Sequence, residues 1–395
     1  MDERLEPAQA LPVDAESAVL VGRVWLPEAD GPAVVAVRGG KLHDLTALAP
    51  TMSELCNAPD PVALARTSGA PVIGDVAAIL ANSRYDRRDR ALPWLLAPID
   101  LQACKAAGVT FVRSMLERVV EERARGDAAK SEAIRTDLVR LVGGDLRAIV
   151  PGSEAAARVK AHLIEQGAWS QYLEVGIGPD AEIFTKAQPM SSVGTGAEIG
   201  IHPGSRWNNP EPEVVLVVNA AGSVVGATLG NDVNLRDFEG RSALLLGKAK
   251  DNNASSAVGP FIRLFADGFR IDDVRRAELT MTVEGTDGFT LKGASSMAEI
   301  SRDPLDLVAQ GSGKNHQYPD GFVLYCGTMF APVEDRDAPG QGFTHHLGDT
   351  VTIASPKLGT LVNRVAQTDQ VEPWTFGAMA LMRNLAARGL LAART

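Results

Sequence analysis

Residues 210–232 read PEPEVVLVVNAAGSVVGATLGND, which is two apolar strands around a turn with carboxylates at both outer ends. If Ala221 and Gly222 form a two-residue hairpin loop, Glu211 faces Asp232 across the two strands. Because side chains alternate along a strand, Glu213 then lies on the same face as Glu211. The hairpin therefore predicts three carboxylates at one point.

The turn leaves alternatives open. A three-residue loop through Asn219 or Ser223 would send Asp232 to the opposite face, unless a bulge at Gly226 or Gly230 restored the register. A solvated acidic edge is also the ordinary interpretation of an isolated Glu-x-Glu pair.

A cluster of three carboxylates repels itself unless a cation neutralises it. Ligands that are all oxygen favour Mg²⁺, Mn²⁺ or Ca²⁺ over zinc or copper. We therefore expect a metal-dependent site, with Mg²⁺ as the cofactor and Mn²⁺ or Ca²⁺ able to replace it.

The composition narrows the classes of function. The chain has 395 residues, 45% of them hydrophobic, and a net charge of −10. This size predicts two domains, and the negative charge opposes nucleic-acid binding, which needs clustered Lys and Arg. Three widely spaced cysteines form no disulfide or metal pattern, which favours a reducing cytoplasm. We expect no signal peptide, because the start of the chain has no apolar core behind a basic segment. We expect no membrane span, because the most apolar stretch, residues 214–230, is interrupted by Asn219 and Ser223 and flanked by carboxylates.

The pattern along the chain predicts a small β-rich N-terminal domain over residues 1–98 and a catalytic domain over residues 99–395. Most of residues 172–300 and 320–366 have the character of short strands. Helices are expected at the following ranges: 101–124, 128–141, 153–166 with Ser153 as the cap, 240–264 and 373–393.

Six short motifs, which follow one another along the chain, resemble motifs of the fumarylacetoacetate hydrolase superfamily. Within that superfamily, the sequences of these motifs are similar to those of dehydratases that act on 2-keto-3-deoxypentonates. The motifs are YLEV (172–175), NNPEPE (208–213), GNDVNLRD (230–237), GP (259–260), GDTVTI (348–353) and LGTLVNRV (358–365).

The resemblance implies an α+β fold, a mixed β-sandwich roll with flanking helices, in the catalytic domain. It implies Mg²⁺ held by Glu211, Glu213 and Asp232, the same three residues that the hairpin brings together. It also implies a small 2-keto sugar acid as substrate and assembly as a homodimer or homotetramer. The expected reaction is loss of water from a 2-keto-3-deoxypentonate derived from D-xylonate or arabinonate, which gives 2-ketoglutarate semialdehyde.

Two residues are candidates for proton transfer. Lys250 lies nine residues before Gly259, at the position of a family lysine that projects into the site. Burial near a metal would lower its pKa and let it act as a base, although an isolated Lys is more often exposed. Glu182 matches an acidic residue of the dehydratase branch, and we expect it to act at the leaving hydroxyl. A strand-end surface carboxylate is its competing interpretation.

Many hydrolytic members carry a His-x-x-Glu pair on the first helix, and the matching residues here are Ser114 and Glu117. Without that imidazole, hydrolysis loses its expected general base, which favours elimination. A hydrolase or decarboxylase acting on an acylpyruvate-like diketo acid is the alternative function. Further candidates for substrate binding are Lys186, Arg236 and Thr328, with a structural ion pair or a plain turn as their alternatives.

Overall fold

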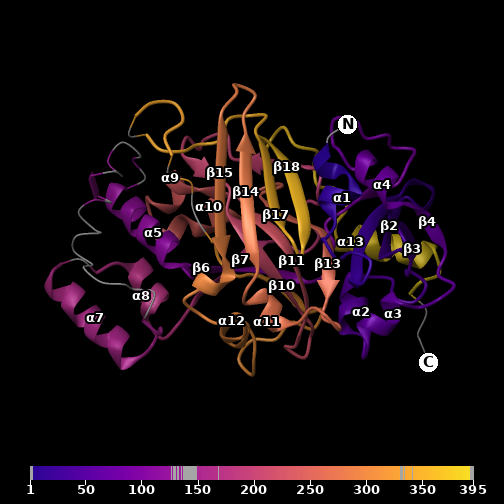
Figure 1. Cartoon of the computed structure of the whole chain (residues 1–395), viewed down its shortest axis with the longest axis horizontal. Coiled ribbons are helices and arrows are strands. Elements are labelled where there is room, and N and C mark those ends of the chain that lie inside the picture. Colours follow the sequence, from indigo (N-terminus) through magenta and orange to yellow (C-terminus); the bar gives the residue numbers. More distant parts are fainter. Residues whose placement is uncertain are drawn as a thin grey trace.

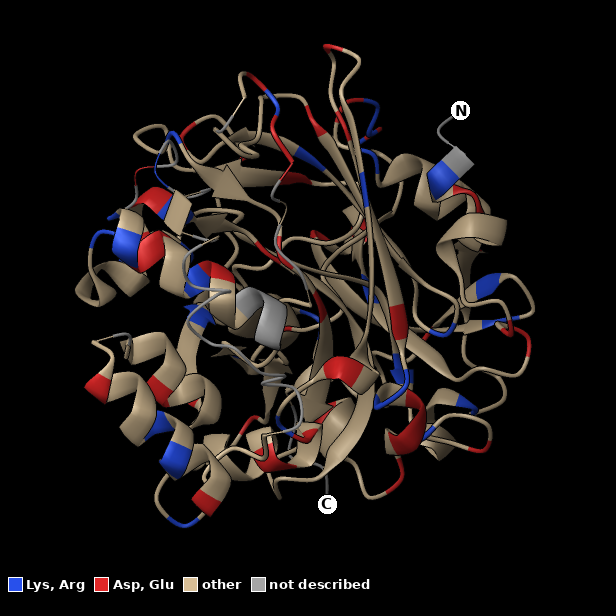
Figure 2. Ribbon diagram, turned by 60° about the vertical axis from the view of Figure 1, so that its left-hand side comes forward, with Lys and Arg blue, Asp and Glu red and all other residues tan. Residues whose placement is uncertain are grey.

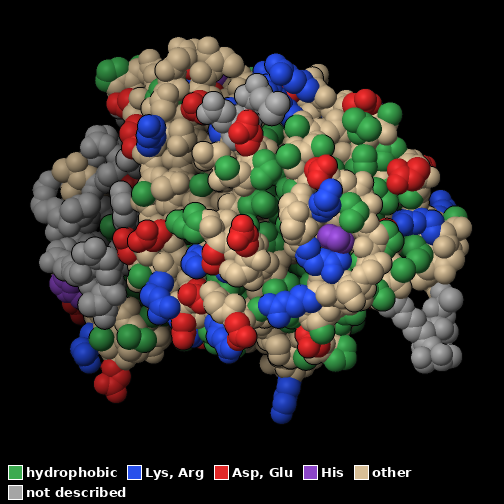
Figure 3. Space-filling model, turned by 45° about the vertical axis from the view of Figure 1, so that its right-hand side comes forward, with side chains coloured by type: hydrophobic (Ala, Val, Ile, Leu, Met, Phe, Trp, Pro, Cys, Tyr) green, Lys and Arg blue, Asp and Glu red, His purple; other side chains and the backbone are tan. Residues whose placement is uncertain are grey.

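The computed structural model describes residues 3–125, 127, 130, 133, 134, 136, 149–167, 169–329, 332, 334–339 and 341–391, without the side chains of residues 3 and 112–114. Within these ranges, no helix has both the length and the apolar composition needed to cross a membrane. Lys and Arg are interspersed with Asp and Glu along the helices in Figure 2. Figure 3 shows hydrophobic side chains scattered among charges of both signs on one face, as on an ordinary solvated surface.

A large mixed sheet runs through the molecule in the order β4-β3-β2-β1-β13-β11-β10-β16-β6-β7, with β5 paired to β1. Its strands are β1 (Leu20–Leu26), β2 (Gly31–Arg38), β3 (Lys41–Asp44), β4 (Val72–Asp75), β5 (Trp94–Leu95), β6 (Ala103–Gly108), β7 (Glu182–Ala187), β10 (Pro212–Val218), β11 (Val224–Asp232), β13 (Ser256–Leu264) and β16 (Phe322–Tyr325). The strands of the first 98 residues join this sheet where β1 pairs with β13. The domain boundary at residue 98 stays a prediction.

A second sheet packs against the first (Figure 1). It has the order β15 (Thr290–Ser296), β14 (Glu278–Glu284), β17 (Thr350–Ser355), β18 (Gly359–Gln367) and β8 (Glu198–Ile201). Leu216 and Leu229 of the large sheet share one buried cluster with Val283, Val351 and Val365 of the second. The predicted α+β sandwich is therefore confirmed. A short ladder joins β9 (Asn208–Asn209) to β12 (Asn234–Leu235).

Helices flank the two sheets and lie at both ends of the molecule (Figure 1). Ser153 caps the helix that follows it, as predicted, by accepting a hydrogen bond from the Ala156 N–H. The helices are α1 (Pro7–Ala10), α2 (Met52–Asn57), α3 (Pro61–Ala65), α4 (Val76–Asn82), α5 (Val112–Ala124), α7 (Glu154–Glu165), α8 (Gln171–Ile177), α9 (Arg236–Glu239), α10 (Leu246–Lys250), α11 (Ile271–Val274), α12 (Pro304–Gly311) and α13 (Ala378–Ala387).

Three expected helices need correction. The helix predicted over 240–264 is wrong in its second half, where Ser256–Leu264 forms the fully buried strand β13. A strand buried on both faces is apolar throughout, so its periodicity does not distinguish it from a helix. The helix predicted over 101–124 begins only at Val112, after strand β6, and the one at 373–393 is confined to Ala378–Ala387. Most of the helix predicted at 128–141 lies outside the described residues.

The predicted two-residue hairpin loop is also wrong, yet the predicted register holds. Asn219 N–H bonds to Ser223 O at 2.9 Å, so three residues separate the strands at the turn. A bulge then restores the register, because Val218 pairs with Val224 and Val217 with Gly226. Beyond the bulge, Glu213 pairs with Gly230, and the Asp232 N–H donates to Glu211 O at 3.0 Å.

Candidate active site

The hairpin brings its three carboxylates together at its open end. Carboxylate oxygens of Glu211, Glu213 and Asp232 lie within 4.8 Å of one another. Each residue is at most 2% exposed, so the interpretation as a solvated acidic edge does not hold. The shared face predicted from the sequence is therefore confirmed.

Two lysines contact this cluster from other elements. Lys250, at the end of α10, places Nζ 2.6 Å from Glu211 Oε2 and 3.1 Å from Asp232 Oδ2. Lys186, on β7, places Nζ 2.9 Å from Asp232 Oδ1 and also donates to the carbonyl oxygens of Val233 and Lys250. Both lysines are buried, so the expectation that an isolated Lys is exposed fails here.

A third cation, Arg118 of α5, escaped the sequence analysis. Its guanidinium pairs with Glu211, lies 2.7 Å from Glu121 Oε2 and lies 3.2 Å from Glu239 Oε2. Arg236 completes this network, with Nε 3.2 Å from Glu121 Oε1. The sequence spacing could have indicated that Arg118 is buried, since it follows Met115 by three residues and so lies on the buried face of its helix.

The charges of this network show whether a metal ion fits the site. Its ion-paired groups balance, with one positive charge for each negative one: Arg118, Lys186, Arg236 and Lys250 against Glu121, Glu211, Asp232 and Glu239. Within the part of the chain that the structure describes, Glu213 and Glu182 have no ion pair. Glu213 accepts a hydrogen bond from the Gly327 N–H, at 2.7 Å. Two uncompensated carboxylates and a set of oxygen donors fit a divalent cation at the three clustered carboxylates.

The pKa values of Glu213 and Lys250 reflect the excess of negative charge at the carboxylate cluster. Burial, Asp232 and Glu211 together raise the pKa of Glu213 well above its usual range. Burial alone would lower the pKa of Lys250, but the Asp232 and Glu211 carboxylates outweigh burial and hold this pKa above its ordinary value. The lowering of the Lys250 pKa was predicted for a site with a bound metal and stays a prediction; in the metal-free protein the contact of the ammonium with two carboxylates has the opposite effect.

Glu182 is the first residue of β7, on the strand that also carries Lys186. Gly108 of the neighbouring strand leaves room for it, because a Cβ at Gly108 would overlap the Glu182 carboxylate. Burial and the nearby charge of Glu239 raise the pKa of Glu182 to about 7, against the opposing charges of Lys250 and Arg118. The carboxyl therefore exchanges its proton near neutral pH.

The remaining candidates are less clearly connected to a substrate. Arg236 is buried, bonds Asn209 Oδ1 at 2.9 Å and pairs with Glu121, as in the structural alternative. Thr328 is 5% exposed and follows Gly327, whose N–H binds Glu213. Glu117 is half-buried on α5, and the side chain of Ser114 lies outside the described residues. Substrate binding by Ser114, Glu117, Lys186, Arg236 and Thr328 stays a prediction.

We expect Arg118→Met to destabilise the protein by about 3–5 kcal/mol, because it leaves three buried carboxylates without a shared cation. Urea denaturation of the metal-free protein measures this change. Arg123→Met, on the same helix and half-buried, is the control and should change stability little. A loss below about 1 kcal/mol in Arg118→Met would show that the network does not hold α5 against the site.

Residues 156–366, more than half of the chain, match the family model described as fumarylacetoacetate (FAA) hydrolase C-terminal. The chain belongs to the fumarylacetoacetate hydrolase family. This family membership confirms the resemblance on which the site residues were assigned.

Two curated relatives are named as dehydratases. One, the probable 2-keto-3-deoxyxylonate dehydratase of Haloferax volcanii, is 32% identical over 49% of this chain and 63% of its own length. The other, the 2-dehydro-3-deoxy-D-arabinonate dehydratase of Saccharolobus solfataricus, is 27% identical over 48% of this chain and 60% of its own length. The chain thus matches about three fifths of each relative.

Solved structures share the fold. A 2-keto-3-deoxy-D-arabinonate dehydratase complexed with magnesium and 2,5-dioxopentanoate has a TM-score of 0.59 and 18% identity, over 88% of this chain and 99% of that one. A fumarylacetoacetate hydrolase from Exiguobacterium antarcticum has a TM-score of 0.55 and 16% identity, over 89% of this chain and all (100%) of that one. These matches confirm the predicted fold of the family.

Proposed function

We propose that this protein dehydrates a 2-keto-3-deoxypentonate to 2-ketoglutarate semialdehyde with the help of Mg²⁺. The observation that carries the proposal is the pair of ionic contacts between Lys250 and the buried carboxylates of Glu211 and Asp232. Glu182, on strand β7, which contacts the helix of Lys250, supplies a second group for proton transfer. The names of the two curated relatives support a substrate of this class. All three cysteines are buried and free, in keeping with a cytoplasmic enzyme.

Glu211, Glu213 and Asp232 would hold the divalent cation. When bound, the cation would attract the carboxylate and keto oxygens of a 2-keto acid, make the protons on carbon 3 acidic and offset the negative charge that holds Lys250 protonated.

Lys250 and Glu182 divide the proton transfers. Lys250 removes a proton from carbon 3 through Nζ, and the electron pair of that C–H bond forms the new carbon–carbon double bond. The bond between carbon 4 and its hydroxyl breaks as Glu182 donates its proton to the departing oxygen, which leaves as water. A proton shift from carbon 5 to carbon 3 then moves the double bond to carbons 4 and 5, and the resulting enol becomes the aldehyde as its hydroxyl proton moves to carbon 4. A pKa of about 7 suits Glu182 to this donation near neutral pH.

Incubation of the Mg²⁺-loaded protein with racemic 2-keto-3-deoxypentonate tests the proposal. We expect 2-ketoglutarate semialdehyde by NMR, with no cleavage of a carbon–carbon bond. If the protein instead leaves this substrate intact and cleaves an acylpyruvate, it is a hydrolase and the dehydratase proposal fails.

The pKa of Glu182 predicts a dependence of stability on pH. Its folded pKa of about 7 lies above its ordinary value of 4.5, so the native state holds this proton more tightly than the unfolded state. Glu182→Gln should therefore gain stability relative to the wild type as pH rises from 4.5 to about 7 and level off above that range. Urea denaturation of both metal-free proteins between pH 5 and pH 8 measures the difference. A difference that does not vary with pH would show that the Glu182 pKa is not raised.

A further inference from the structure

The outer face of the second sheet carries a polar row that the proposed reaction does not use. Arg364 of β18 lies directly opposite Thr350 of β17, so the two side chains share a face. The residues that follow them, Val351 and Val365, point to the opposite face and belong to the buried core. Arg364 and Thr350 thus face away from the core that β17 and β18 share with the carboxylate hairpin.

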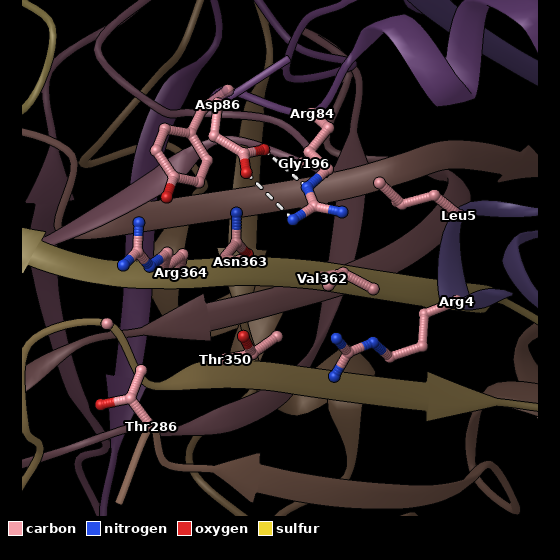
Figure 4. A pocket seen from close by; sticks show the side chains of 12 residues that line it. Arg4, Leu5, Arg84, Asp86, Gly196, Thr286, Thr350, Val362, Asn363 and Arg364 are labelled. Atoms are coloured by element: carbon pink, nitrogen blue, oxygen red, sulfur yellow. Dashed lines mark hydrogen bonds and ion pairs between the residues drawn. The ribbon is translucent and has the colours of Figure 1, made fainter. Parts of the chain in front are cut away.

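Two other segments cover this row and close a cavity of about 300 Å³. Arg4 and Leu5 come from the N-terminal segment, and residues 84–86 come from the loop after α4. In Figure 4 the guanidinium groups of Arg4, Arg84 and Arg364 surround Thr350 and Asn363 on the floor of the cavity. The cavity is therefore lined by three cations from three separate parts of the chain.

Arg364 is the cation of this cavity that remains uncompensated. Its guanidinium lies 5.3 Å from the centre of the Tyr85 ring, and its side chain has no ion pair or hydrogen bond among the described residues. Arg84, by contrast, forms a two-point pair with Asp86, with Nε and Nη2 bonds of 2.6 and 3.0 Å (Figure 4). Arg4 pairs with Glu284.

The Arg84 pair leaves the Nη1 group of that guanidinium outside it. Together with Arg364 and the Thr350 and Thr286 hydroxyls, this arrangement offers several N–H and O–H donors to one small cavity. Planar guanidinium groups bind carboxylate or phosphate oxygens by parallel hydrogen bonds. A cavity near the lower limit of ligand pockets, which is about 300 Å³, suits a small ligand.

We propose that this cavity is a second ligand site, which binds a small organic dianion through a carboxylate or phosphate group held by Arg364. The ligand would join the N-terminal segment and the loop at residues 84–86 to strands β17 and β18. Asp86 also lines the cavity, so its carboxylate opposes the incoming anion.

Calorimetric titration of the metal-free protein with malonate and, separately, with inorganic phosphate tests this site. Chloride is kept at matched ionic strength, and the absence of metal keeps anions away from the acidic cluster. We expect saturable binding of at least one probe at one site per chain. Binding of malonate alone would identify a ligand with carboxylate groups, and binding of phosphate alone would identify a phosphorylated ligand. Binding of both probes would support a site that accepts either anion.

Variants locate the binding. Arg364→Gln should weaken it about tenfold or more, the scale of a lost charged hydrogen bond. Arg276→Gln is the control, because this side chain is 70% exposed at the end of α11, far from the cavity lining. Asp86→Asn removes the negative charge from the cavity lining and should bind the probe more tightly, a gain that a folding defect would not produce. The proposal is overturned if neither probe binds saturably, if Arg364→Gln binds like the wild type, or if Asp86→Asn binds no more tightly.

Discussion

Lys250→Met should lower turnover of the 2-keto-3-deoxypentonate about a hundredfold or more, the scale for losing a positioned proton-transfer group. The same change should leave Mn²⁺ affinity undiminished or increase it. The ammonium contacts Glu211 and Asp232 and therefore competes with a cation for these carboxylates. Steady-state kinetics and calorimetric titration with Mn²⁺ measure the two effects.

Lys248→Met is the matched control, because Lys248 lies on the same helix with an exposed side chain. It should keep wild-type turnover. Exchange of the carbon 3 protons with heavy water separates the two proposed proton-transfer roles, since Glu182→Gln should still exchange them and Lys250→Met should not. Wild-type turnover in Lys250→Met would exclude this lysine as the base.

Glu213→Gln should abolish the thermal stabilisation that Mg²⁺ gives the wild type and reduce activity with it. The amide keeps the shape of the side chain but removes a negative charge that a hard cation needs. Without metal, the variant should be at least as stable as the wild type, because Glu213 is buried beside two other carboxylates and has no ion pair among the described residues. Thermal unfolding with and without Mg²⁺ measures both effects.

Glu278→Gln is the control for this prediction, since Glu278 is exposed on β14. It should respond to Mg²⁺ as the wild type does. An undiminished Mg²⁺ response in Glu213→Gln would mean that Glu213 is not a ligand, whatever happens to activity.

Local sequence was enough to predict the acidic cluster because the alternation of Glu211, Glu213 and the apolar strand residues determines the face. The turn itself could not be predicted, since the extra loop residue and the bulge at Val225 compensate for each other. Either change alone would have sent Asp232 to the wrong face. The register was therefore right although the loop was wrong.

The ion pairs around Arg118 could not be predicted from local sequence patterns, because most of them join residues that are distant in the sequence. Glu121 is on the same helix as Arg118, but Glu211 and Glu239 come from other elements, and only the folded chain brings them together. The contacts of Lys250 with Glu211 and Asp232, which raise its pKa in the metal-free protein, could not be predicted for the same reason. Strand β13 was missed because it is buried on both faces and so lacks alternation.

The proposed function depends on the binding of one divalent cation by the buried carboxylates of the hairpin. Anomalous diffraction from crystals equilibrated with saturating Mn²⁺ tests it most directly. We expect one strong peak bonded to oxygens of Glu211, Glu213 and Asp232, with the Lys250 ammonium moved away from at least one of the carboxylates it contacts. No peak at this cluster, with Lys250 still bound to Glu211 and Asp232, would contradict the claim.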